Sequence, residues 1–412
     1  MKMTIGHNKT TLIWLIIGNV IKSLTQWGLL VLLIKYYTTK EVGIFTYALA
    51  LASPVFVLTN MQLKSLLVVE PSGETDNFKI YHAVRCMTSG LTFAGLMVYA
   101  IISSNLGGIV VGVFLYKVVE SLIDIIYGYY QKKDMMIRMS KFDITKTVIV
   151  LLVCLLTTIV LRKIEFTLLS LVVASALFYV IISYDVNKVL SRQDSFCWTK
   201  VYDIIKKAFP LGISICIASY MTNYPRLALQ NICGPEMLAY FGAYAYLVAG
   251  IFQINIPFHI FLRQRLSTSY QHSDIRDFRR KVNLSILFFI GMGAFLVVVF
   301  LLGGERIICF LYNKEYAVYS EVLILLIIAE TINRVSGILS TAVLSFNIYT
   351  KQAIISGFSL AVVVLLSGVV ISKYGIWGGG YVCIVAALML TGCYSYIYLK
   401  KLKAWRLSLQ KG

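Results

Sequence analysis

Long apolar segments recur from one end of the 412-residue chain to the other, and short polar stretches separate them. Each segment has about 20 or more mostly apolar residues, the length that an α-helix needs to cross the roughly 30 Å hydrocarbon core of a bilayer. The pattern predicts spans at 11–34, 42–70, 80–102, 107–130, 142–161, 165–187, 208–232, 236–262, 282–302, 318–346, 352–371 and 375–399. The predicted fold is an all-α polytopic membrane protein with about 12 transmembrane helices.

Composition supports this prediction, and the charge distribution orients it. Hydrophobic residues make up 58% of the chain and charged residues 14%, proportions that soluble domains seldom show. The net charge of +19 would suggest nucleic acid as the partner of a soluble protein. Here 24 basic residues fall on the side of the N-terminus and only 7 on the opposite side of the predicted spans. By the positive-inside rule, we expect both termini in the cytoplasm and no nucleic-acid partner.

The basic loop 188–207 divides the predicted spans into six and six. We therefore expect an N-terminal lobe at 1–187, a cytoplasmic linker at 188–207 and a C-terminal lobe at 208–412. The first span of each lobe carries polar residues at i, i+3, i+4 and i+7: Asn19, Lys22, Ser23 and Gln26, then Ser219, Thr222, Asn223 and Arg226. Six spans per lobe predict parallel pseudo-repeats, with both polar stripes facing a central cavity.

Several cations lie inside the predicted spans, where facing lipid would cost each roughly 2.5–3.5 kcal/mol or more. Lys22, Lys117 and Arg334 are ten or more residues from either end of their spans, about 15 Å along a helix. Arg226 lies on the polar face of its span beside Pro225, where a kink is expected. We expect these four cations to line one substrate cavity, together with the amides of Asn19, Asn223 and Asn333. Lys64, Arg85 and Lys146 lie nearer the cytoplasmic ends, so we expect them to snorkel to the interface.

Acidic residues accompany these cations. Lys117, Glu120 and Asp124 are spaced i, i+3, i+7 on one helical face, and Glu330 precedes Arg334 by four residues. Such pairs can simply neutralise buried charge. Alternatively, the carboxylates can exchange a counter-ion or proton while the cations hold a substrate. The two interpretations stand equal for Glu120 and Glu330, whereas Asp124 has no basic neighbour on its own helix and favours the functional one.

The remaining chemistry-bearing residues indicate no cofactor, metal site or enzyme. The eight cysteines and four histidines are dispersed and form neither a CxxC motif nor a Cys/His cluster. The longest loop expected outside the cytoplasm, 303–317, is too short to hold a catalytic domain. Five tyrosines lie around the seventh and eighth spans, and interfacial belt positions are more typical for them than a sugar-stacking role. They are Tyr220, Tyr224, Tyr240, Tyr244 and Tyr246.

The motifs of the seventh span and its hairpin resemble a known family. Phe209-Pro210-Leu211-Gly212, Asn223-Tyr224-Pro225-Arg226 and Tyr240-Phe241-Gly242-Ala243-Tyr244 are similar to the corresponding region of Wzx-type polysaccharide transporters. The basic segment 131–143 and the glycine-rich segment 374–380 also resemble that family. These transporters belong to the multidrug/oligosaccharidyl-lipid/polysaccharide (MOP) exporter superfamily. The resemblance extends over the whole chain in length and in the number and spacing of spans.

This resemblance implies a flippase rather than an enzyme. Its substrate would be an undecaprenyl-diphosphate-linked oligosaccharide repeat unit of O-antigen (lipopolysaccharide) or capsule type. Alternating access of the two lobes would move that unit from the cytoplasmic to the periplasmic leaflet of the bacterial inner membrane. The bilayer and the lipid-linked glycan would be its main partners, with a polysaccharide polymerase and a chain-length regulator as further candidates.

The sequence leaves three alternatives to this flippase function. A multidrug antiporter of the same superfamily usually carries organic cations, which suit deep basic residues poorly. A polysaccharide polymerase or ligase has a similar number of spans, but by resemblance it carries a large outer loop with catalytic arginines or histidines. A lipid II flippase usually has more than twelve spans.

Overall fold

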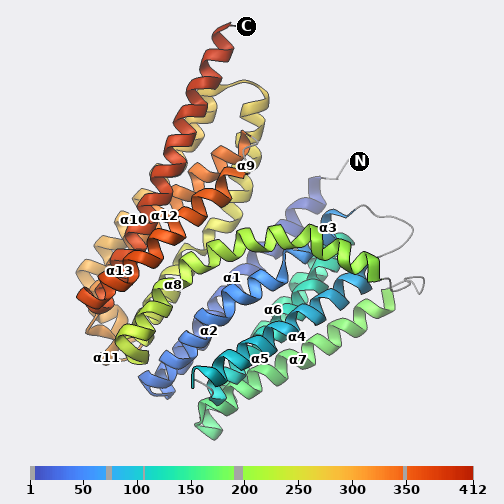
Figure 1. Cartoon of the computed structure of the whole chain (residues 1–412), viewed down its shortest axis with the longest axis vertical. Helices are drawn as coiled ribbons and strands as arrows, with labels where there is room; N and C mark the ends of the chain where they lie inside the picture. Colours follow the sequence, from blue (N-terminus) through green and yellow to red (C-terminus); the bar gives the residue numbers. More distant parts are fainter. Residues whose placement is uncertain (1–4, 71–76, 105–106, 190–197, 347–349, 412) are drawn as a thin grey trace. The chain divides into compact units, whose positions relative to one another are not determined.

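The computed structural model describes residues 5–70, 77–104, 107–189, 198–346 and 350–411. The regular structure within these ranges is helical and contains no strand, as Figure 1 shows. The prediction of an all-α membrane fold is confirmed.

The helices follow the predicted spans closely. Those of the first half are α1 (Ile5–Tyr36), α2 (Thr39–Asn60), α3 (Leu63–Val69), α4 (Phe78–Ile102), α5 (Gly108–Lys132), α6 (Met136–Leu161) and α7 (Ile164–Val189). The long helix α8 (Trp198–Ile251) follows, and then η1 (Phe252–Ile254), α9 (Asn255–Gln271), α10 (Ile275–Leu311), α11 (Lys314–Ala317), α12 (Ser320–Ser345) and α13 (Thr350–Lys411).

Nine segments of the described chain are long and apolar enough to cross a membrane. Two of them, α8 and α13, bend at Gly234 (φ 85°) and Gly375 (φ 57°), a backbone conformation that glycine adopts at little cost. The charged helix α5 fills one further predicted span. With both arms of each bent helix counted separately, these segments correspond to the twelve predicted spans. The division predicted between the spans 208–232 and 236–262 is present at Gly234, whereas α8 keeps helical dihedral angles through Pro225.

The chain divides into two compact units, Met1–Ser219 and Tyr220–Gly412. The boundary lies inside α8, because its first part packs with the helices that precede it. Residues 190–197, in the middle of the expected linker, lie outside the described residues. The lobe limits 1–187 and 208–412, and the central cavity between the lobes, stay predictions.

The predicted span 42–70 consists of two helices. A capping box starts α2: Thr38 Oγ1 accepts from the backbone N–H of Glu41 (3.3 Å), and the Thr38 N–H donates to Glu41 Oε2 (2.8 Å). The left-handed residues Met61 (φ 47°) and Gln62 (φ 52°) then separate α2 from α3. The break places Lys64 at the start of a new helix, beside Asp124 and Gly128 in the second half of α5.

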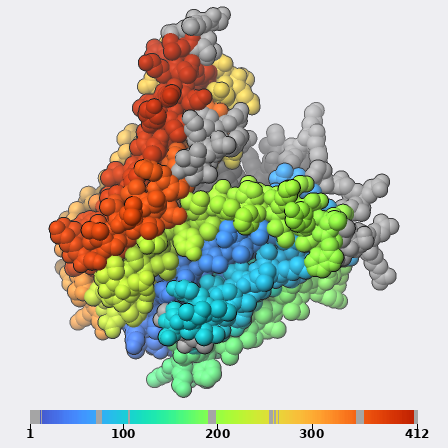
Figure 2. Space-filling view, viewed as in Figure 1, coloured from blue at the N-terminus to red at the C-terminus, as the bar shows by residue number. Residues whose placement is uncertain are grey.

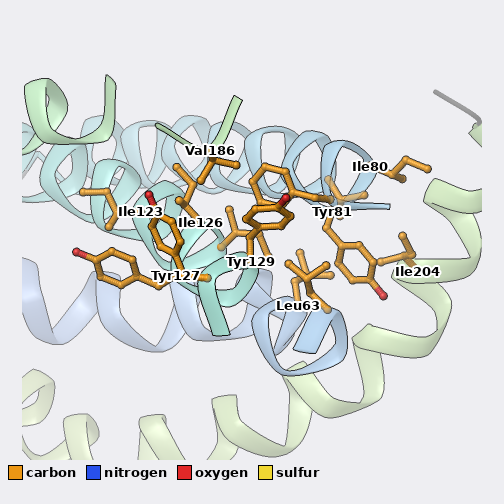
Figure 3. Packing of buried hydrophobic residues seen from close by; sticks show 14 of the residues in the cluster. Leu63, Ile80, Tyr81, Ile123, Ile126, Tyr127, Tyr129, Val186 and Ile204 are labelled. Atoms are coloured by element: carbon orange, nitrogen blue, oxygen red, sulfur yellow. The ribbon is translucent and has the colours of Figure 1, made fainter. Parts of the chain in front are cut away.

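Helix α5 is the centre of the first unit. It packs against α2, α3, α4 and α7. Figure 3 shows its apolar face, with Ile123, Ile126 and Tyr129 in a buried cluster that also includes side chains of α3, α4, α7 and α8. Because there is no hydrophobic drive between helices in lipid, this close packing is what stabilises the bundle. With this face fixed in the cluster, the charged face of α5 turns toward a cavity.

The first part of α8 closes one side of that unit. Val201, Ile204 and Ala208 join the buried cluster. One turn later, a Cβ on Gly212 would lie 2.6 Å from the backbone oxygen of Leu58, so only glycine permits this approach of α8 to α2. In Figure 2 this part of α8 (green) lies across the blue helices of the unit.

The second unit is built around α12, which packs against α13, α10 and α9. Tyr244 is fully buried and donates its hydroxyl to the backbone carbonyl of Tyr316, and Tyr312 donates to the carbonyl of Ala243 (3.0 Å). These bonds join the second arm of α8 to α11 and to the end of α10. The expectation that Tyr244 is an interfacial belt residue is therefore wrong, because its ring lies in the core.

Candidate functional site

A cavity of about 460 Å³ lies inside the first unit. Residues of α1, α2, α3, α5 and α6 line it, so the whole cavity belongs to one compact unit. The charged lining residues are Lys22, Lys64, Lys117 and Lys146, with Glu120, Asp124 and Asp143. The neutral polar lining includes Asn19, Ser53, Asn60, Ser121 and Gln131. Such a concentration of charge inside membrane-spanning helices indicates a functional site.

The spacing along α5 explains three of these positions. Lys117, Glu120 and Asp124 share one face of the helix, opposite Ile126 of the buried cluster. The structure places all three on the cavity wall. Lys22 reaches the same cavity from α1, one turn after Asn19. Of the residues predicted for the N-terminal lobe, the structure thus brings all five to one site.

Carboxylates hold three of the four lysines. Lys117 Nζ lies 2.9 Å from Glu120 Oε2, Lys64 Nζ lies 3.2 Å from Asp124 Oδ1, and Lys146 Nζ lies 3.6 Å from Asp143 Oδ1. Among the described residues, Lys22 forms no ion pair within 4.0 Å. The described lining residues therefore carry one positive charge more than their carboxylates balance.

Asp124 has a second cationic partner behind the cavity wall. Arg85 Nη2 on α4 lies 3.5 Å from Asp124 Oδ2, and the arginine is fully buried. Arg85 Nε and Nη1 have no hydrogen-bond partner in the described part of the chain. Asp124 is thus the only carboxylate in the described residues that pairs with Arg85, and its apparent isolation in the sequence is resolved by partners from α3 and α4.

The expectation that Lys64, Arg85 and Lys146 snorkel to the interface is wrong. Lys146 is buried and Arg85 fully so, and Lys64 and Lys146 line the cavity. Their helices pack with these faces inward, so each charge meets a carboxylate inside the unit. The position of a residue along its span indicates its distance from the membrane interface. It does not show which side chains of other helices lie next to it. The spacing of Asp143 and Lys146, three residues apart inside one span, is the signal that sequence analysis overlooked.

A second, smaller pocket of about 230 Å³ lies within the second unit. Helices α8, α12 and α13 line it, and its polar lining residues are Thr222, Arg226, Glu330, Asn333 and Cys383. Arg226 Nη1 donates to Asn223 Oδ1 (3.4 Å), and its guanidinium carbon lies 5.2 Å from the centre of the Tyr246 ring. The sequence pattern did not predict this role for Tyr246.

Arg334 takes another position. It pairs with Glu330 one turn earlier on α12 and lies 5.8 Å from the Phe252 ring, and it is not among the residues that line the pocket. The four predicted cations are thus divided between the units: Lys22 and Lys117 in the first, Arg226 and Arg334 in the second. Their convergence on one space between the lobes stays a prediction.

No protein-family model matches the chain. A curated relative, the capsular polysaccharide biosynthesis protein CapF of Staphylococcus aureus, is 24% identical over 397 residues. That match covers 93% of this chain and 98% of the relative.

Several solved structures share the fold. A lipid II flippase MurJ in an inward closed conformation has a TM-score of 0.71 at 13% identity, and the match covers 98% of this chain and 92% of that one. A mutant of the Vibrio cholerae MATE transporter VcmN has a TM-score of 0.62 at 9% identity, covering 97% and 98%. A MOP-superfamily transporter from Pyrococcus furiosus has a TM-score of 0.60 at 13% identity, covering 98% and 100%. The chain therefore has the fold of MOP-superfamily transporters, and the resemblance that its motifs indicate is confirmed.

Proposed function

We propose that this multi-pass membrane protein is a flippase for undecaprenyl-diphosphate-linked oligosaccharide repeat units. It moves them from the cytoplasmic to the periplasmic leaflet of the bacterial inner membrane, with both of its termini in the cytoplasm. Its relative in capsular polysaccharide biosynthesis favours a capsule-type unit over an O-antigen unit, and the fold it shares with a lipid II flippase supports a lipid-linked substrate.

The observation that carries this proposal is the lysine cavity of the first unit. Four ammonium groups line about 460 Å³ inside helices that cross the membrane. Each charge is expensive in such a place, and internal ion pairs alone are weak evidence for stability. A diphosphate explains them, because lysine is a compact point charge that binds phosphate without demanding a planar, bidentate geometry.

The ion pairs suggest how the cavity alternates between empty and loaded states. In the structure Glu120, Asp124 and Asp143 neutralise three lysines. A diphosphate replaces these carboxylates as the ligand of the ammonium groups, while Asp124 keeps Arg85 as its partner. The three paired lysines then have a counter-charge both before and after the diphosphate binds. This lowers the free-energy barrier for the diphosphate to enter and leave the cavity.

Transport itself needs no covalent chemistry. The polyprenyl tail stays in the bilayer, and only the diphosphate and the sugars cross through the protein as the two lobes alternate. Glu120, Asp124 and Glu330 are candidates for exchanging a coupling proton or counter-ion during this cycle. A polysaccharide polymerase and a chain-length regulator would act on the delivered unit, so they are candidate partners.

An organic-cation antiporter is the second candidate, since MATE transporters share the fold. The excess positive charge of the lysine cavity disfavours it, because a cationic substrate would be repelled. A polysaccharide polymerase is less well supported than either transporter.

Reconstitution separates these functions. Purified protein is placed in liposomes containing a fluorescent undecaprenyl-diphosphate oligosaccharide, and a membrane-impermeant reductant reports the rate at which the label changes leaflet. We expect the protein to accelerate the exchange, and a Lys22→Met/Lys117→Met variant to lose the acceleration. Lys163→Met, in the exposed turn between α6 and α7, is the matched control and should stay active. Uptake of organic cations without glycolipid exchange would instead identify an antiporter.

A further inference from the structure

The pocket of the second unit has a different chemistry from the lysine cavity. Its volume of about 230 Å³ is below the roughly 300–1,000 Å³ of pockets that hold drug-sized ligands, so it suits one ring of a larger substrate. Among its described lining residues there is one cation, Arg226, and one carboxylate, Glu330. Phe241, Ala245 and Val248 provide an apolar wall. A diphosphate needs several cations, whereas this pocket combines a cation with a carboxylate and an apolar wall.

The guanidinium of Arg226 is held in an orientation that suits a planar anion. The cation–π contact with Tyr246 (5.2 Å) and the long hydrogen bond to Asn223 (3.4 Å) orient its guanidinium. Within the described residues it forms no ion pair with a carboxylate, unlike the three paired lysines of the first unit and Arg334. A guanidinium has five N–H donors in a fork that matches a carboxylate in bidentate fashion. A ligand carboxylate would complete this site.

The other polar groups suit hydroxyls. Glu330 is held in place by its ion pair with Arg334 and by Asn333, whose Nδ2 donates to Oε2 (3.2 Å). Each carboxylate oxygen has two lone pairs, so Glu330 still accepts from a ligand hydroxyl, and Thr222 lines the same pocket. The fixed negative charge of Glu330 disfavours a multiply charged phosphate here but accepts a neutral hydroxyl.

We infer that this pocket binds an acidic sugar residue of the translocated glycan, with its carboxylate on Arg226 and its hydroxyls toward Glu330 and Asn333. The inference rests on the proposed flippase function and narrows its substrate to glycans that contain a uronic-acid type of sugar. Lysines then serve the diphosphate in one unit, and an arginine serves a sugar carboxylate in the other.

Cys383 provides a reporter that needs no mutation, because it lines the pocket. The wild-type protein is treated with a small thiol reagent, and peptide mass spectrometry measures the labelling rate at each cysteine. Glucuronate should slow labelling of Cys383, by roughly tenfold at ten times its Kd, because only the unoccupied fraction reacts. Glucose, which lacks the carboxylate, should protect much less. Cys309 and Cys393, outside the pocket lining, are internal controls whose rates should not change.

A variant and a second anion complete the test. Arg226→Gln should remove the protection by glucuronate, measured as the ratio of the labelling rates of Cys383 with and without sugar in the same variant. Equal protection by glucose and glucuronate, or protection of Cys383 by inorganic pyrophosphate, would overturn the inference. These comparisons use the wild-type protein, so they test whether the pocket binds an acidic sugar even where the variant fails to fold.

A reporter in the first unit keeps this result separate from the proposed function. Ser53 lines the lysine cavity, so a Ser53→Cys variant reports on its occupancy through the labelling rate of the introduced thiol. Pyrophosphate that protects this thiol while glucuronate fails to protect Cys383 rejects the sugar pocket and leaves the flippase proposal standing. Glucuronate that protects Cys383 while pyrophosphate fails at the first unit supports the sugar pocket and contradicts the diphosphate site.

Discussion

Arg85, fully buried on α4, lies 3.5 Å from the carboxylate of Asp124, which lines the lysine cavity from α5. The same carboxylate holds Lys64 at 3.2 Å from the side of the cavity. Asp124 therefore keeps Arg85 as a counter-charge when an anionic substrate binds Lys64 in place of the carboxylate.

This relationship predicts a non-additive effect on stability. Asp124→Leu strands a buried arginine, so we expect it to destabilise the protein by about 3–5 kcal/mol. Removing Arg85 as well, in an Arg85→Met/Asp124→Leu double variant, should recover much of that loss because no buried charge remains unpaired. Thermal unfolding in detergent measures both. Additive losses would show that the two side chains do not stabilise each other.

Lys146 provides a second prediction, opposite to the expectation of a snorkelling residue. Because Lys146 lines the cavity and pairs with Asp143, Lys146→Met should weaken pyrophosphate binding by roughly tenfold or more, the loss of one charge-assisted hydrogen bond of about 1.5–3 kcal/mol. Isothermal titration calorimetry measures the affinity. Lys141→Met, an exposed position on the same helix, is the control and should bind normally. Unchanged affinity of the Lys146 variant would remove it from the site.

A third prediction concerns Arg226 in the second unit. Arg226→Ala should abolish surface-polysaccharide export while the protein stays in the membrane, because no cation is then left among the described residues that line the pocket. Arg226→Lys should restore part of it, since a point charge survives but the bidentate fork is lost. Export in a deletion strain complemented with each variant measures this. Arg306→Ala, at an exposed position of α10, should export normally.

Close packing predicts a fourth effect. Gly212→Ala would bring a Cβ to 2.6 Å from the backbone oxygen of Leu58, so α8 must move away from α2, and we expect a loss of roughly 1–3 kcal/mol. Gly90→Ala in α4 has open space around its Cβ and should be neutral or slightly stabilising, because alanine favours a helix over glycine. Comparing their unfolding temperatures checks the contact. Equal behaviour of the two variants would place α8 away from α2.

The sequence predicted the helices well and their partners poorly. Apolar length gives the spans because every backbone group in lipid must be bonded within its own helix. The bends at Gly234 and Gly375 carry a glycine signal, and each lies at a predicted division between two spans. The break at Met61 and Gln62 carries no glycine or proline, so it was not predicted.

In the candidate site, too, the pattern along a single helix was predicted and the contacts between helices were not. The charged face of α5 was predicted because Lys117, Glu120 and Asp124 lie on one helix at helical spacing. The pairs of Lys64 and Arg85 with Asp124 join three different helices, and no periodicity along one helix encodes them. Burial of Lys146 likewise depends on how α6 turns against its neighbours.

The last prediction addresses what Asp124 does during transport. In Asp124→Asn the amide oxygen still accepts from Arg85, so the protein should fold, but Lys64 loses its counter-charge. The described lining residues then have two positive charges in excess instead of one. We expect pyrophosphate to bind roughly tenfold more tightly, equivalent to about 1.5 kcal/mol, and the bound state to release its anion more slowly. Glycolipid exchange in liposomes should slow accordingly, while binding is retained.

Asp134→Asn is the matched control for this experiment. Asp134 lies in the exposed turn after α5 with a left-handed backbone (φ 57°), which asparagine tolerates, so neither binding nor exchange should change. Added salt should weaken pyrophosphate binding to both variants, with the larger absolute affinity kept by Asp124→Asn. An Asp124→Asn protein that binds pyrophosphate as the wild type does, and that exchanges glycolipid normally from about pH 6 to 8, would contradict the competition between carboxylate and substrate. Asp124 would then be a structural partner of Arg85, and the coupling role would pass to Glu120, which holds Lys117 in the same cavity.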